Sequence, residues 1–231
     1  MKYYKFTLNM VLMNVLSIVL FIAAGVLVFA CGYEFNFKFT NPGMPMLISF
    51  GCFGYLFLHE ICHGIGYTIF AKNKKNIKYG IALEKGVLYA MCQEELSKTG
   101  IIVSLLFPLF FLTVVTLPIG IIFHIDILVL YSIINFGGAI GDMVMTIFMF
   151  KCPSDVKYID YDNTIGAYLI SKHDLSKIKS CSMKFEESGN PKDMKVNDKI
   201  KFFTITKGSI IFFVVYGIIT LLTTIPFIIW R

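Results

Sequence analysis

Apolar residues in this chain are gathered into five long runs. They lie near residues 10–30, 44–71, 99–123, 126–150 and 208–230. Each run is close to, or longer than, the ~20 residues that an α-helix needs to cross a bilayer. We therefore predict an all-α polytopic membrane protein with about five transmembrane helices.

The polar segments between these runs differ in pattern. From 77 to 92, apolar residues alternate with others on either side of the turn-forming sequence Glu84-Lys85-Gly86. This alternation predicts a short β-hairpin directly after the second run, and a surface loop with chance alternation is the alternative. Residues 151–206 form the one extended polar segment and have little periodicity. We expect a small, partly disordered insertion there.

Lysine residues set the expected orientation of the spans. They gather between the second and third runs and in 151–206, whereas the linkers 31–43 and 124–126 carry almost no positive charge. Lysine-rich loops stay in the cytoplasm, so we expect a multi-pass protein of the cell membrane with its N-terminus inside and its C-terminus outside. The predicted organisation is a membrane core over 1–150, a cytoplasmic segment over 151–206 and a final transmembrane helix over 207–231.

The composition agrees with a membrane environment. Of 231 residues, 56% are hydrophobic and 16% are charged. A soluble domain of this size buries too little surface to hide so many apolar side chains. We therefore expect the lipid bilayer to be a partner of the chain. The net charge of +6 comes from lysines in the polar segments, and we expect no nucleic-acid partner. Nothing in the sequence indicates an oligomeric state.

One ionisable cluster interrupts the second run, in the sequence His59-Glu60-Ile61-Cys62-His63. Histidines four residues apart share one face of a helix, so both can bind one zinc ion. Glu60, about 100° round the helix, can reach a water on that ion. The alternative is a pair of hydrogen-bonded core histidines. An unpaired glutamate inside a span costs about 3 kcal/mol or more, which favours the metal site.

Catalytic zinc needs a third protein ligand. Of fifteen Asp and Glu residues, only Glu60 and Asp142 lie well inside a predicted span. At 1.5 Å per residue, Asp142 lies at about the depth of the two histidines, whereas His124 lies about 20 Å away. Asp142 is therefore the predicted third ligand, and a carboxylate that only joins two helices is the alternative. Asn135 lies two turns earlier, where its amide can bind the substrate backbone or form an interhelical hydrogen bond.

These residues resemble the putative zincin peptidase family of bacterial membrane proteins. That family is similar to the site-2-protease type of intramembrane zinc metalloproteases. The resemblance rests on the sequence from His59 to His63, on the hairpin after it and on Gly141-Asp142, and it covers roughly residues 50–165. It implies zinc as cofactor, the two histidines and Asp142 as its ligands, and Glu60 as the catalytic residue.

The predicted function is therefore a membrane-embedded zinc metalloprotease. We expect it to hydrolyse peptide bonds of membrane-associated protein substrates, with Glu60 as the general base towards a zinc-activated water. The alternative is a non-proteolytic, zincin-like membrane protein with a binding or regulatory role. A metal transporter is disfavoured because the spans contain few polar groups.

Overall fold

A computed structural model of the whole chain describes most of residues 1–189. The described ranges are 1–37, 43–82, 87–160, 167–176, 178 and 183–189. The predicted final span, the predicted turn at 84–86 and the polar segment from 190 onwards lie outside the described residues.

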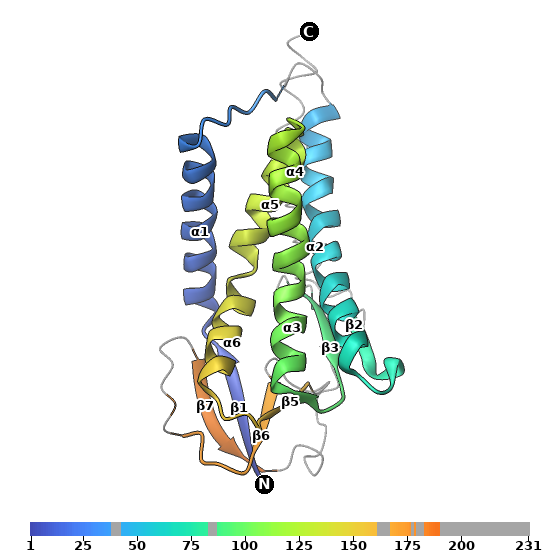
Figure 1. Cartoon of the computed structure of the whole chain (residues 1–231), viewed down its shortest axis with the longest axis vertical. Helices are drawn as coiled ribbons and strands as arrows, with labels where there is room; N and C mark the ends of the chain where they lie inside the picture. The colour runs from blue at the N-terminus through green and yellow to red at the C-terminus, as the bar shows by residue number, and fades with distance from the viewer. Residues whose placement is uncertain (38–42, 83–86, 161–166, 177, 179–182, 190–231) are drawn as a thin grey trace.

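The described helices form an elongated bundle (Figure 1). They are α1 (Met10–Ala30), α2 (Gly43–Phe70), α3 (Lys98–Leu109), α4 (Thr116–Ile122), α5 (Asp126–Gly138) and α6 (Ile140–Lys151), with a short 3-10 helix η1 (Lys74–Asn76) and a π-helical segment η3 (Phe110–Val115). In the described part of the chain, α1, α2 and the continuous α3–η3–α4 helix are long and apolar enough to cross a bilayer. The helices α5 and α6 are bent by 47° relative to each other, and they make a fourth span if the pair is counted as a single span. The predicted span at 126–150 thus consists of two helices.

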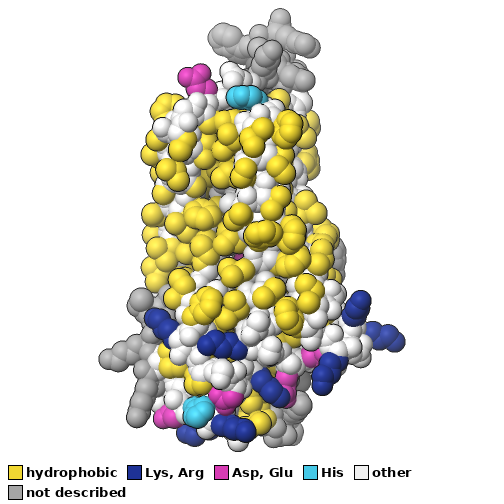
Figure 2. Space-filling model, viewed as in Figure 1, with side chains coloured by type: hydrophobic (Ala, Val, Ile, Leu, Met, Phe, Trp, Pro, Cys, Tyr) yellow, Lys and Arg dark blue, Asp and Glu magenta, His cyan; other side chains and the backbone are white. Residues whose placement is uncertain are grey.

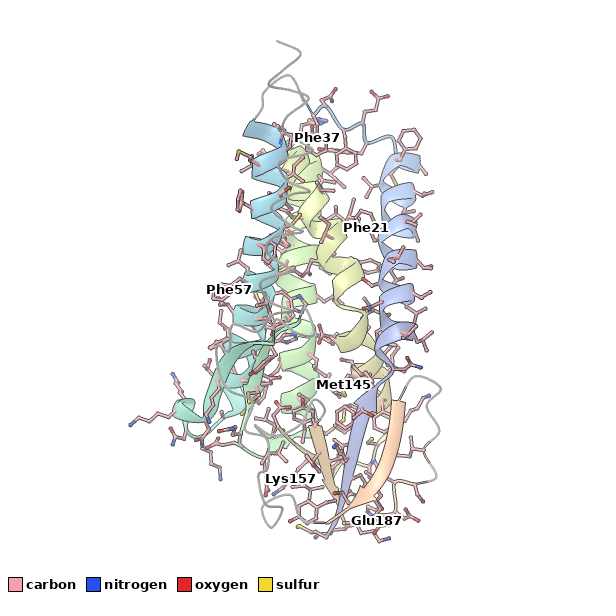
Figure 3. All side chains as sticks on the ribbon, turned by 180° about the vertical axis from the view of Figure 1, so that it is seen from behind. Phe21, Phe37, Phe57, Met145, Lys157 and Glu187 are labelled. Atoms are coloured by element: carbon pink, nitrogen blue, oxygen red, sulfur yellow. The ribbon has the colours of Figure 1, made fainter. Side chains whose placement is uncertain are left out.

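The outer surface of the bundle is hydrophobic over most of its length. In Figure 2, apolar side chains cover the helices, and lysines gather at the end that carries the sheet. Leu27 of α1 is 65% exposed and Phe57 of α2 is 50% exposed, and Figure 3 shows Phe57 partway along its helix. Soluble proteins rarely expose so large a continuous apolar surface, so this band fits contact with lipid.

A five-stranded antiparallel sheet lies at one end of the bundle. Its strands are β1 (Lys2–Leu8), β4 (Leu96–Ser97), β5 (Lys157–Asp160), β6 (Ala167–Ser171) and β7 (Met183–Ser188), in the order β4-β5-β6-β1-β7. The hydrophobic pattern of the sequence does not predict this sheet. The N-terminal strand pairs with both β6 and β7, so the N-terminus and the described strands of the polar segment lie on the same side of the bundle.

The sheet packs against the nearest helix ends. Tyr4 and Phe6 of β1 and Leu169 of β6 share a buried core with Ile101 of α3 and Met149 of α6. Burying such side chains contributes roughly 1.5–3 kcal/mol each. The sheet is therefore an integral part of the helical core and not a separate appendage.

A second, two-stranded sheet lies beside α2. It consists of β2 (Ile77–Ala82) and β3 (Val87–Cys92), paired antiparallel from Ile77 opposite Cys92 to Ala82 opposite Val87. Glu94, just beyond β3, accepts hydrogen bonds from the backbone N–H groups of Lys72 (2.7 Å) and Asn73 (3.1 Å). This carboxylate fastens the hairpin to the end of α2.

Candidate metal centre

Three side chains converge between α2 and α6. His59 and His63 lie one turn apart on α2, and their Nε2 atoms are 3.1 Å apart. The Asp142 carboxylate, in the first turn of α6, lies 3.2 Å from Nε2 of His59 and 3.3 Å from Nε2 of His63. The structure thus brings together the three residues that the sequence predicts as metal ligands.

The spacing of these donor atoms fits a tetrahedral ion. Zinc bonds of about 2.0–2.1 Å to histidine nitrogen and carboxylate oxygen put neighbouring ligand atoms about 3.3 Å apart in a tetrahedron. The observed separations are 3.1, 3.2 and 3.3 Å. Two imidazoles and one carboxylate also form a donor set of catalytic zinc, which keeps a fourth position open. Zinc is the ion that this chemistry fits.

Hydrogen bonds fix which nitrogen of each ring faces the centre. Nδ1 of His59 lies 2.8 Å from Oδ1 of Asn135, and Nδ1 of His63 lies 2.8 Å from the carbonyl oxygen of Ser104. Both partners accept, so each Nδ1 carries a proton, and in the neutral ring the lone pair of Nε2 points into the centre. In that form two lone pairs and a carboxylate face one another, an arrangement that a bound cation would stabilise.

Asn135 is held in one orientation by the surrounding helices. Its Nδ2 donates to Oγ1 of Thr113 at 2.9 Å and to the carbonyl oxygen of Pro108 at 3.2 Å. These donor bonds assign the opposite atom, Oδ1, as the acceptor for His59. Asn135 therefore forms interhelical hydrogen bonds, and its predicted contact with substrate stays a prediction.

Pro108 explains why the Ser104 carbonyl is available to His63. In an α-helix the carbonyl of residue 104 accepts from the N–H of residue 108, but proline has no N–H. The carbonyl accepts from His63 instead. The sequence does not indicate this role of Ser104, because a backbone carbonyl leaves no side-chain signal.

The following π-helical segment frees further carbonyls. The carbonyl oxygen of Leu112 accepts from the hydroxyls of Tyr55 (2.7 Å) and Thr116 (2.9 Å), so α2 is held to this segment one turn from His59. Segments of this kind are frequent at functional sites because they redirect backbone groups.

Glycine residues allow the helices to approach at the centre. A Cβ added to Gly66 of α2 would lie 2.7 Å from the backbone Cα of Ser104, so a side chain there would push α3 away from His63. The pair Gly137-Gly138 lies just before the bend between α5 and α6, and sharp helix bends are common at small residues. Asp142 then lies in the first turn of a new helix, where the helix dipole favours a carboxylate.

Glu60 lies beside the ligands and is bonded to the hairpin. Its Oε2 accepts from the backbone N–H of Ala90 in β3 at 2.6 Å, and its carboxylate interacts electrostatically with both histidines and with Asp142. The predicted base is thus next to the centre, with one oxygen engaged by β3.

Asp160 is a further acid near β3, and no motif in the sequence marks it. Oδ2 accepts from the backbone N–H of Cys92 at 3.0 Å, and Oδ1 accepts from the hydroxyl of Tyr158 at 2.7 Å. Burial raises the pKa of Asp160 to about 6, although both hydrogen bonds oppose the shift. The residue lies in a segment expected to be irregular, so no pattern marked it.

The two remaining histidines lie outside the cluster. His124, at the end of α4, stacks on Tyr33 with the ring centres 6.0 Å apart. His173, in the sheet region, lies 3.7 Å from Asp155. Among the described residues, the one cluster of histidine, cysteine or acidic side chains able to hold a metal is His59, His63 and Asp142.

The fold and this centre define a class: a helical membrane-type protein with a histidine–histidine–aspartate metal site. Residues 52–157, a little under half of the chain, match the family model described as "Putative zincin peptidase". The match spans the three predicted ligands, Glu60 and the strands β2 and β3. It supports a zincin-like peptidase family, a zinc metallopeptidase activity and zinc as the cofactor. Neither the curated proteins nor the solved structures contain a significant match to the chain.

Proposed function

We propose that this protein is an intramembrane zinc metalloprotease that hydrolyses peptide bonds of membrane-associated protein substrates. The observation that carries the proposal is the meeting of two Nε2 atoms and one carboxylate within apolar helices, with Glu60 beside them. Ionisable residues are costly in such helices and are retained where they act.

The centre has a division of roles among its residues. His59, His63 and Asp142 would hold the metal, while Asn135 and the Ser104 carbonyl keep the Nε2 atoms of both imidazoles turned towards the centre. Zinc bound there supplies a Lewis acid that polarises a peptide carbonyl and lowers the pKa of water towards 7.

Glu60 is the proposed general base. Its carboxylate takes the proton of the attacking water at Oε and then delivers it to the nitrogen of the leaving amine. Proton transfer by a positioned side chain of this kind contributes typically 10²–10⁴-fold to the rate.

The hairpin is the proposed holder of the substrate. A helical peptide bond is shielded by its own turn, so a substrate span must become extended before attack. An extended backbone can add to the edge of a sheet through main-chain hydrogen bonds, and β3 lies against Glu60. A substrate contact of Asn135 remains a further proposal.

The proposed environment is the lipid bilayer, with the N-terminus in the cytoplasm and the C-terminus outside. We propose no nucleic-acid partner. The hydrophobic band and the lysines at the sheet end support this orientation. The pairing of β1 with β6 and β7 is consistent with it, because it keeps the N-terminus and these two strands of the polar segment on one side.

The test is the substitution Glu60→Gln in the full chain, compared with Glu187→Gln as a control carboxylate that is exposed in β7, away from the centre and from β3. We expect Glu60→Gln to keep its zinc, to lose cleavage of membrane proteins by about 10²-fold or more, and to accumulate uncleaved partners. Unchanged cleavage would refute the proposal. A Glu60→Gln variant that holds the same partners as the unaltered protein would support the alternative, a non-proteolytic binding or regulatory protein.

A further inference from the structure

The strand β3 has one edge turned away from β2. The backbone N–H of Gln93, one residue beyond β3, donates to the carbonyl of Asn76 at 2.9 Å, in register with the pairing of β2 and β3. Backbone groups of alternate residues point to opposite sides of an antiparallel strand. The N–H groups of Ala90 and Cys92 therefore lie on the outer edge of β3.

Carboxylates from two other elements accept hydrogen bonds from these two outer N–H groups. Glu60 of α2 accepts from Ala90 at 2.6 Å, and Asp160 of β5 accepts from Cys92 at 3.0 Å. Donors two residues apart on a strand are separated by about 6.8 Å, the spacing at which a neighbouring strand presents its carbonyls. The two acids thus take the places that an added strand would use.

We infer that Glu60 and Asp160 cap the outer edge of β3, and that the backbone of an extended peptide substrate docks there by displacing them. This inference rests on the proposed function and assigns the docking register within it. When a substrate carbonyl accepts from Ala90, the Glu60 carboxylate is released from β3. The base is therefore engaged by β3 until a substrate strand is in place.

The two caps differ in how they are held. Asp160 belongs to the five-stranded sheet and is also fixed by the hydroxyl of Tyr158 at 2.7 Å. Glu60 belongs to the helix that carries the metal-binding histidines. A substrate strand that bonds to Ala90 therefore displaces the proposed catalytic carboxylate. A strand that bonds to Cys92 displaces Asp160 and so breaks the contact between β3 and the five-stranded sheet.

The experiment measures binding of a fluorescein-labelled peptide of alternating valine and alanine to the zinc-loaded full chain in lipid nanodiscs, by fluorescence anisotropy. Glu60→Gln and Glu60→Ala both lack the base, but only glutamine keeps an acceptor for Ala90. We expect Glu60→Ala to bind the peptide on the order of tenfold more tightly than Glu60→Gln, because a competing hydrogen bond is gone. Equal or weaker binding by Glu60→Ala would overturn the inference.

A second pair tests the other cap without touching the first. In the Glu60→Gln background, Asp160→Ala removes the acceptor for Cys92 and Asp160→Asn keeps one. We expect tighter binding only for Asp160→Ala, with equal zinc content in both variants as the check of folding. Tighter binding by both variants, or by neither, would contradict the capping of Cys92.

Peptide variants test the strand register directly. Two peptides are compared, one N-methylated at its odd-numbered residues and one at its even-numbered residues. One of them should lose binding and the other should keep it, because only alternate N–H groups face β3. Equal effects in both peptides would overturn strand addition. None of these binding measurements requires cleavage. A negative binding result therefore does not change the outcome of the Glu60→Gln cleavage test, and a negative cleavage test does not change the meaning of the binding results.

Discussion

His59 and His63 can act as ligands because their Nδ1 atoms are held by oxygen acceptors. The sequence predicts the ligands themselves from the four-residue spacing and from the matching depth of Asp142. It does not predict the acceptors, because Asn135 lies 76 positions from His59 and the other acceptor is a backbone carbonyl. Matching depth along the spans brings Asp142 to the histidines, but it does not say which oxygen meets which ring nitrogen.

At the residue scale, Asn135→Ala should weaken zinc binding. The substitution removes the acceptor that keeps His59 Nδ1 protonated and its ring fixed. Losses of such supporting contacts typically lower metal affinity 10–100-fold. Competition with a zinc chelator measures the change. Asn14→Ala, at an exposed position of α1, is the control, and equal zinc affinity of the two variants would contradict the role assigned to Asn135.

Elements meet at the centre because two of them depart from regular helix geometry. Proline in α3 and the π-helical segment after it free carbonyls for side chains of α2 and α5, and the bend between α5 and α6 begins a new helix at Ile140. The sequence predicts the spans from their hydrophobicity. It does not predict the five-stranded sheet, because β1 pairs with strands more than 150 residues away.

At the element scale, Pro108→Ala should weaken zinc binding although Pro108 is not one of the three predicted ligands. Alanine restores an N–H that competes with His63 for the Ser104 carbonyl. The helix itself should become more regular and the protein no less stable. Thermal unfolding and chelator competition together check both effects.

The matched control is Pro118→Ala, which restores an N–H in α4 at an exposed position. We expect zinc affinity within about twofold of the unaltered protein for this control and a larger loss for Pro108→Ala. Identical affinities would mean that the missing N–H at residue 108 does not serve the centre.

The whole molecule combines a hydrophobic bundle with a polar end built from both termini of the described chain. Figure 3 shows Lys157 and Glu187 at the sheet end, away from Phe57 in the apolar band. The orientation in the membrane rests on the lysine distribution, which the sequence provides directly.

At this scale, a membrane-impermeant maleimide added to intact cells should modify Cys31, which is exposed after α1. A cysteine introduced by Lys172→Cys, at an exposed position beyond β6, should react only after permeabilisation. Mass spectrometry of the labelled peptides gives the readout. The reverse pattern would invert the proposed topology.

The central claim is a single zinc site formed by three residues from two helices. Metal analysis of the purified full chain tests it most directly, with the unaltered protein beside His59→Ala and Asp142→Ala. We expect about one zinc per chain in the unaltered protein and a loss of zinc in both variants, because each removes a ligand. Full zinc in the folded Asp142→Ala variant would contradict the account.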